Sequence, residues 1–197
     1  MRRLVVLSLF AAFLAAGVNA APIAFVAPDE GIQLRDTSEK TLPVGSPTTV
    51  LTTGGITFNL YYTDVINHSG VGFDGVNGAA AQARVSDVLT YIASVLHESG
   101  TLDVLVNASQ TDGSGALAFA GTYYPLAAGY FPGSTLARLH DPQDAKPFAG
   151  YEEIGVTVDF GWPWNFSTVS APGNLVDFMS VLTHEMTHGL GFAGLMG

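Results

Sequence analysis

The feature that most constrains the fold is a change of hydrophobic period within residues 48–108. Residues 48–64 are dense in β-branched and aromatic side chains that alternate with polar ones, which is typical of a strand, or of a hairpin folded at Gly54-Gly55. Residues 79–96 place Val and Leu side chains at helical spacing, and residues 101–108 return to a strand pattern. A chain that mixes the two periods in this way belongs to the α+β class.

Further along, the same reasoning predicts strands over residues 116–124 and 154–160, with a long loop over residues 125–153 between them. A last helix is expected after Pro172-Gly173, ending around Gly189 or Gly191. Four residues supply the expected helix boundaries: Asn77 and Gly100 for the first helix, and Asn174 as a cap with Asp177 in the first turn for the last.

Composition narrows the class of protein. The chain has 197 residues, 48% of them hydrophobic, which is enough for one domain with a core. A net charge of -10 argues against binding nucleic acid or an anionic membrane surface, because both need clustered Lys and Arg. The chain contains no cysteine, so any metal must be bound through nitrogen and oxygen.

The N-terminus has the pattern of a secretory signal peptide. Arg2 and Arg3 precede an apolar run, and small residues lead to an expected cleavage site after Ala20. The alternative is an uncleaved membrane anchor, but the apolar run is short for a bilayer span. We therefore expect a signal peptide at 1–20, an extended leader at 21–47 that lies on the domain or stays mobile, and a single folded domain at 48–197. The expected location is extracellular or in a bacterial cell envelope, with no stable membrane anchor.

The predicted last helix contains His184-Glu185-Met186-Thr187-His188. At about 100° per residue, the two histidines lie about 40° apart on one helix face, so their imidazoles can bind one ion. An apolar stripe lies on the opposite side of this helix, so the histidines are expected to face a cleft. The stripe steps by four, three and four residues: Leu175, Met179, Leu182 and Met186. The competing interpretation is that the histidines are only hydrogen-bonded surface groups.

These residue types suit metal-assisted hydrolysis. Two neutral histidines and a third protein ligand leave Zn²⁺ with an open position for water, whose pKa falls to about 7. Glu185 could then take the proton of that water as the water attacks a carbonyl, and pass it to the leaving amine.

The segment from His184 to Phe192 resembles the metzincin signature H-E-x-x-H-x-x-G-x-x-H as far as Gly191. The preceding order of strands and helices also resembles that of zincin metallopeptidases. The resemblance implies a twisted mixed or antiparallel sheet with a backing helix and an active-site helix. It further implies that His184 and His188 are zinc ligands, that Glu185 is the general base, and that Gly191 lets the chain leave the helix and bring a further ligand to the metal.

The sequence departs from this signature at its third ligand, because Gly194 stands where the last histidine is expected. Three explanations are open. A continuation of the chain beyond residue 197 could supply the ligand, an upstream group such as His140 with Asp141 could supply it, or the site is incomplete and inactive.

Other residues with functional side chains occur elsewhere in the chain. His68 and His97 are explained by their places after a strand and at a helix end. The segment 111–115 contains residues found in calcium loops, but its spacing favours a turn. The aromatic segment Trp162 to Phe166 either walls a substrate cleft or packs over the end of the sheet. By the resemblance, the strand at 154–160 is an edge strand that pairs with an extended substrate.

We therefore expect a secreted zinc metalloendopeptidase that acts on peptide or protein substrates. The alternative is a secreted binding or surface protein, or a pseudopeptidase, whose zinc site is structural or incomplete. Three protein ligands and an open position would indicate catalysis, whereas four protein ligands would indicate a structural site.

Overall fold

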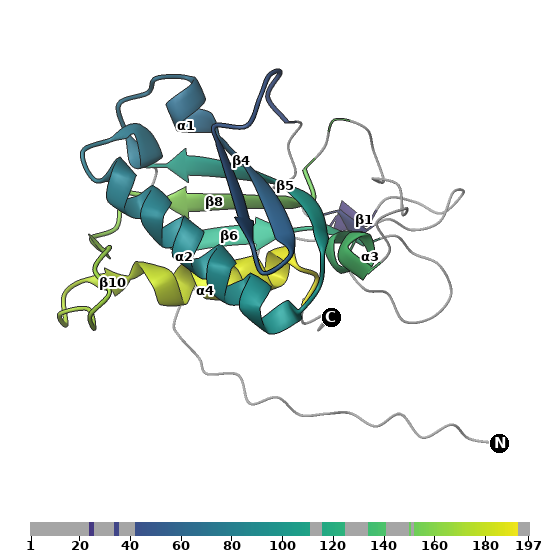
Figure 1. Ribbon diagram of the computed structural model, residues 1–197. Helices are drawn as coiled ribbons and strands as arrows, with labels where there is room; N and C mark the ends of the chain where they lie inside the picture. Colours follow the sequence, from purple (N-terminus) through teal and green to yellow (C-terminus); the bar gives the residue numbers. More distant parts are fainter. Residues whose placement is uncertain are drawn as a thin grey trace.

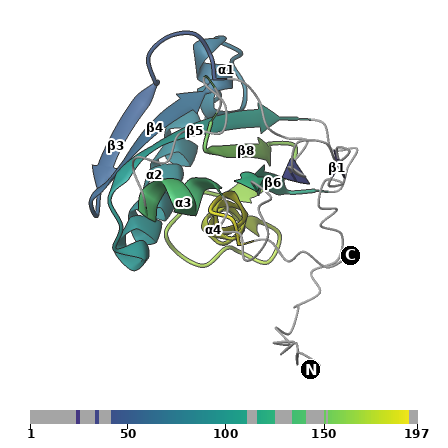
Figure 2. The ribbon, with the colours of Figure 1, turned by 90° about the vertical axis from the view of Figure 1, so that its right-hand side faces the viewer.

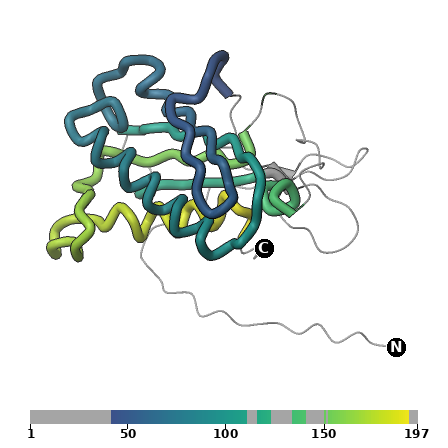
Figure 3. The backbone as a smooth tube through the Cα atoms, in the orientation of Figure 1, coloured from purple at the N-terminus to yellow at the C-terminus, as the bar shows by residue number. Residues whose placement is uncertain are grey.

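The computed structural model describes residues 24–25, 34–35, 42–110, 116–124, 134–140, 150 and 152–192. Figure 3 traces most of these segments in colour, from residue 42 onward. The predicted signal peptide, the segment 111–115, Asp141 and Gly194 lie outside them. None of the described helices is both long and apolar enough to cross a membrane.

The chain contains both strands and helices, which combine into a mixed α and β fold (Figure 1). In order they are β1 (Ala24–Phe25), β2 (Leu34–Arg35), β3 (Thr49–Thr53), β4 (Ile56–Tyr62), α1 (Thr63–Ile66), the short 3-10 helix η1 (Gly72–Asp74), α2 (Gly78–Leu96), β5 (Gly100–Ser109), β6 (Ala118–Gly121), β7 (Tyr123–Tyr124), α3 (Ser134–His140), β8 (Ile154–Asp159), β9 (Trp164–Asn165), β10 (Val176–Asp177) and α4 (Phe178–Gly189).

The main sheet has five strands in the order β3-β4-β5-β8-β6. The three inner strands β4, β5 and β8 run parallel, while β3 and β6 are antiparallel to their neighbours and form the two edges. Parallel neighbours need a crossover, and α2 supplies it between β4 and β5. The sheet is therefore mixed, as expected.

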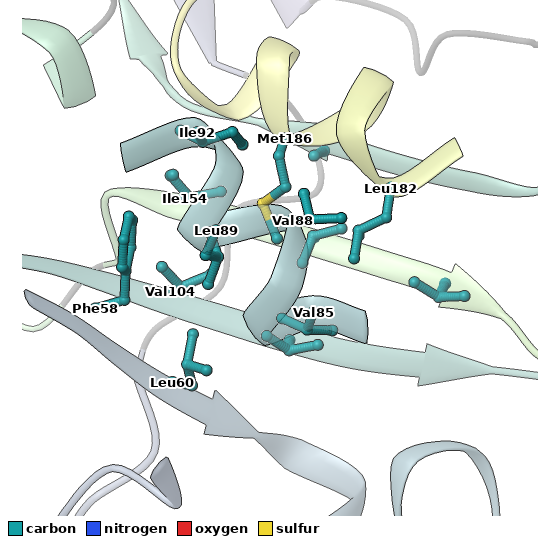
Figure 4. Close-up of a cluster of buried hydrophobic side chains, with 14 of the residues drawn as sticks. Phe58, Leu60, Val85, Val88, Leu89, Ile92, Val104, Ile154, Leu182 and Met186 are labelled. Carbon is teal, nitrogen blue, oxygen red and sulfur yellow. The ribbon is translucent and has the colours of Figure 1, made fainter. Parts of the chain in front are cut away.

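Helices α2 and α4 pack beside each other on one face of this sheet (Figures 1 and 2). The core between them is apolar, and Figure 4 shows Leu182 and Met186 of α4 meeting Val88 and Leu89 of α2 above the strands. All four side chains are buried. Burial of this apolar face is what holds α4 in place, since each such side chain contributes about 1.5–3 kcal/mol.

Two local predictions agree with the structure. Residues 48–64 form the hairpin of β3 and β4, with Gly54 and Gly55 both at positive φ (56° and 90°) in its two-residue turn. Positive φ at both positions suits the right-handed twist of the strands and favours glycine. The helix expected at 79–96 is α2.

Several predicted boundaries are wrong. Helix α2 ends with His97 in the left-handed conformation (φ 55°) instead of at Gly100, and the side chain of Asn77 makes no capping bond. The loop predicted at 125–153 contains α3. The strand predicted at 116–124 is two strands, because β7 leaves the main sheet to pair with β2.

Candidate metal centre on helix α4

Helix α4 begins at Phe178, three residues later than a cap at Asn174 would place it. Asp177 is the actual cap, and its Oδ1 accepts a hydrogen bond from the backbone N–H of Ser180 at 2.7 Å. The residues just before α4 are extended, because Val176 and Asp177 pair with β9. Leu175 therefore does not belong to the helical stripe, whereas Leu182 and Met186 do.

The last turn of α4 lies against β8. A Cβ atom added at Gly189 would come within 2.5 Å of Cγ2 of Ile154, which is closer than carbon atoms can approach. Only a residue without a side chain allows this spacing. Gly189 thus fixes how near the end of α4, with the adjacent His188, lies to the sheet.

The two histidines of the motif converge. Nε2 of His184 and Nε2 of His188 are 3.1 Å apart, and the ring centroids are 4.6 Å apart with the rings nearly perpendicular. Two nitrogens bound at about 2.0–2.1 Å to one tetrahedral Zn²⁺ would lie about 3.3 Å from each other. The arrangement of the imidazoles therefore fits a shared ion.

A backbone carbonyl fixes the tautomer of His188. Its Nδ1 lies 2.9 Å from the carbonyl oxygen of Phe192, which can only accept, so Nδ1 carries the proton and Nε2 keeps its lone pair when the ring is neutral. The turn that brings Phe192 back to the helix passes through Gly191 at φ 105°. The backbone N–H of Phe192 also donates to the carbonyl of Thr187. A metal-binding histidine commonly has such a partner on its other nitrogen.

The charge state of His184 favours metal binding as well. Partial burial, and then the neighbouring His188, lower the pKa of His184 below its usual 6.5, although its side chain is largely exposed. A lowered pKa keeps the imidazole neutral at physiological pH, and only the neutral ring can bind a metal.

Glu185 lies on a different side of the helix from its neighbouring histidine. It is buried, with an exposed fraction of 4%, and its Oε2 accepts a hydrogen bond from the backbone N–H of Ala120 at 3.1 Å. Ala120 belongs to β6, so the carboxylate is held where α4 meets the edge of the sheet.

The strand at the edge is β6, which corrects the prediction for 154–160. That segment forms β8, and it is enclosed between β5 and β6 with all of its residues buried. Its near-continuous apolar run is typical of a central parallel strand. The edge of the sheet on this side is therefore β6.

A third metal ligand is not found among the described residues, where no group of three His, Asp or Glu side chains could hold an ion. His140 ends α3 with its side chain 85% exposed, and its Nδ1 lies 3.8 Å from Oε1 of Glu98. The structure thus does not bring His140 together with His184 and His188.

The aromatic segment before α4 packs instead of lining a cleft. The ring of Trp164 meets Phe178 edge-to-face at 5.3 Å, and its Nε1 donates to the carbonyl of Asp159 at 2.7 Å. Phe166 contacts Phe178 as well, at 4.9 Å between centroids. These rings close the end of the sheet next to the start of α4.

Three residues of the centre were not predicted from the sequence: Ala120, Phe192 and Thr135. The first two act through backbone atoms, and the residue type does not reveal which partner a backbone atom binds. Thr135 is buried, and its hydroxyl lies 2.9 Å from the carbonyl oxygen of Gly189. In the sequence, Thr135 is only the second residue of an ordinary Ser-Thr pair, which here begins α3.

No protein-family model, curated protein or solved structure matches the chain. The function proposed next is therefore argued from α4 and its neighbours.

Proposed function

We propose that the protein is a zinc-dependent endopeptidase in which His184 and His188 bind the metal and Glu185 is the general base. The observation that carries the proposal is the 3.1 Å approach of the two Nε2 atoms on adjacent turns of one helix. When bound, Zn²⁺ supplies a Lewis acid that polarises a carbonyl and activates water.

The chain's own residues support this chemistry in three ways. The carbonyl of Phe192 orients His188 with its Nε2 lone pair free, and the lowered pKa of His184 keeps the second imidazole neutral. The carboxylate of Glu185 is held on the same helix, beside β6. A carboxylate can accept a proton and return it to a leaving amine.

The edge strand β6 indicates the class of substrate that the protein would bind. In the β6–β8 ladder, the backbone groups of Ala118 and Ala120 point away from β8, and the N–H of Ala120 donates to Glu185. An extended peptide can bind the remaining groups of such an edge by adding a strand. We therefore assign peptide or protein chains as substrates. Export of the protein to the cell envelope or the extracellular space remains part of the proposal.

The test uses the full chain with and without zinc. We expect zinc to remain bound after dialysis, as measured by metal analysis, and the zinc-loaded protein to cleave a quenched fluorescent protein substrate. Glu185→Gln retains an oxygen that can accept from Ala120, so this variant should keep zinc and lose proteolysis by at least about 10²-fold. Asp87→Asn, at an exposed ion pair on α2, is the matched control and should be fully active. Unchanged proteolysis in Glu185→Gln would refute the assigned role.

The second candidate is a secreted binding protein or pseudopeptidase with an incomplete or structural zinc site. The lack of a third ligand among the described residues favours it. Zinc binding through His184 and His188 without hydrolysis of any peptide would support this candidate and contradict the enzyme.

A further inference from the structure

A buried row of three hydroxyls connects α3 to the end of α4. Oγ1 of Thr122 lies 3.1 Å from Oγ of Ser134 and 2.6 Å from Oγ1 of Thr135. Oγ1 of Thr135 in turn lies 2.8 Å from the carbonyl oxygen of Glu153 and 2.9 Å from that of Gly189. All three hydroxyl-bearing residues are buried.

The two carbonyls determine the direction of these hydrogen bonds. Carbonyl oxygens only accept, so the single proton of Thr135 must be shared between Glu153 and Gly189. Thr122 must then donate to Thr135, which leaves its own oxygen free to accept from Ser134. Every hydroxyl proton in the row has an acceptor, and the row ends on the last residue of α4.

The row of hydroxyls ends at Gly189, where it can hold the last turn of α4 against the sheet. Gly189 follows His188 directly, and Glu153 precedes Ile154, the residue against which Gly189 packs. Thr135 therefore bridges β8 and α4 at their closest approach. The end of α4 has little intrinsic helix stability, because glycine at positions 189 and 191 favours the unfolded chain. A carbonyl in the last helical turn also lacks a helical partner unless another group donates to it.

We propose that Thr135 is a positioning residue for the metal centre: its buried hydroxyl holds the last turn of α4 on β8 and thereby keeps Nε2 of His188 beside Nε2 of His184. The inference rests on the proposed zinc site. Thr135 itself touches neither the metal nor the substrate.

The experiment compares Thr135→Val, which removes the hydroxyl at nearly constant volume, with Thr135→Ser, which keeps it. We expect Thr135→Val to bind zinc about tenfold more weakly in a chelator competition assay, the range seen when groups supporting a ligand are removed. Its Co²⁺ complex should show an altered visible absorption spectrum. Thr135→Ser should restore both the affinity and the spectrum.

Two controls separate positioning from general loss of stability. Thr157→Val removes a buried hydroxyl that has no hydrogen-bond partner and lies away from α4, and it should leave zinc affinity unchanged. Leu51→Ala lowers stability from β3, at the other edge of the sheet, and should also leave the Co²⁺ spectrum unchanged. If Thr135→Val does not fold, Thr122→Val removes the donor to Thr135, together with the acceptor of Ser134, and should show the same changes at smaller amplitude.

The outcomes distinguish this inference from the proposed function. Wild-type zinc affinity and an unchanged Co²⁺ spectrum in Thr135→Val would overturn the inference, as would failure of Thr135→Ser to restore them. If the wild-type chain binds no zinc, the proposed function fails instead. In that case, amide hydrogen exchange in the metal-free protein tests whether Thr135 holds the end of α4. Thr135→Val should speed exchange at residues 186–192, and Thr157→Val should not.

Discussion

Nε2 of His184 faces Nε2 of His188 at 3.1 Å, although the two residues are one helical turn apart and only His184 is largely exposed. Without a cation, two neutral rings can satisfy this contact by a single N–H···N hydrogen bond, whereas two protonated rings would repel each other. The contact is thus compatible with a neutral pair or a metal-bound pair. Because of this contact, both zinc and pH should change the stability of the protein.

Zinc should stabilise the folded protein through this pair. Binding to the native state alone adds about 2.7 kcal/mol to the free energy of unfolding when free zinc is 100 times Kd. His184→Gln and His188→Gln should each abolish the increase, measured by urea denaturation with and without EDTA. Because the chain has no cysteine, thiolates cannot contribute. His140→Gln is the control, and an increase that depends on His140 would contradict the assignment.

The metal-free protein should lose stability as the pH falls below about 6.5. The pKa of His184 is lower in the folded state than its unfolded value of 6.5, so the unfolded chain binds this proton more readily and acid favours unfolding. This contribution is complete above pH 6.5 and disappears as the pH falls toward the folded pKa. His184→Gln should show a smaller loss between pH 7.5 and 5.5 by urea denaturation in EDTA.

An NMR titration of the ring protons checks the cause of this shift. His188→Gln removes the second of its two causes, so the pKa of His184 should rise toward, but not reach, 6.5. Titration of His184 at or above 6.5 in the wild-type protein would show that the pair is not desolvated as described.

Gly189→Ala should lower the free energy of unfolding by about 1–3 kcal/mol, because the new methyl group would overlap Cγ2 of Ile154. Ile154→Ala removes that atom, so it should cost less in the Gly189→Ala background than in the wild type. A double-mutant cycle by chemical denaturation measures the difference. Strictly additive costs would indicate that α4 can move away from β8 freely.

Asp64→Ala should destabilise the loop around η1 by about 2–3 kcal/mol. The buried carboxylate accepts hydrogen bonds from the backbone N–H groups of Val65, Phe73 and Asp74, and only the last of these also donates to another described group, the carbonyl of Val71. Asp74→Ala is the matched control, since its carboxylate accepts from Gly70 at an exposed position and should matter less. Equal losses measured by thermal unfolding would contradict this ranking.

The parts of the fold that were predicted correctly depend on local chemistry. The hairpin follows from alternation and a Gly-Gly turn, and α2 follows from its apolar spacing, because in both cases residues near in sequence determine the conformation. The start of α4 was placed too early because Val176 pairs with Trp164 of β9, and a contact between distant segments overrides the capping signal at Asn174.

In the candidate site, too, some features follow from local sequence and others depend on contacts between distant segments. Convergence of His184 and His188 follows from helix geometry, which the sequence specifies. The position of Glu185 against Ala120 depends on which strand forms the edge of the sheet, and neighbouring segments in sequence give no information on strand order. His140, one of the three open explanations for the third ligand, does not join the pair, because it lies at the end of α3 with its Nδ1 3.8 Å from Oε1 of Glu98.

Helix α4 follows every strand of the main sheet along the chain, and it packs on β6, β8 and α2. The surface that receives α4 is therefore complete only after all five strands have been synthesised and ordered. A nascent chain that ends before residue 178 lacks both imidazoles, so binding of the proposed zinc ion would be a late step in the maturation of this protein.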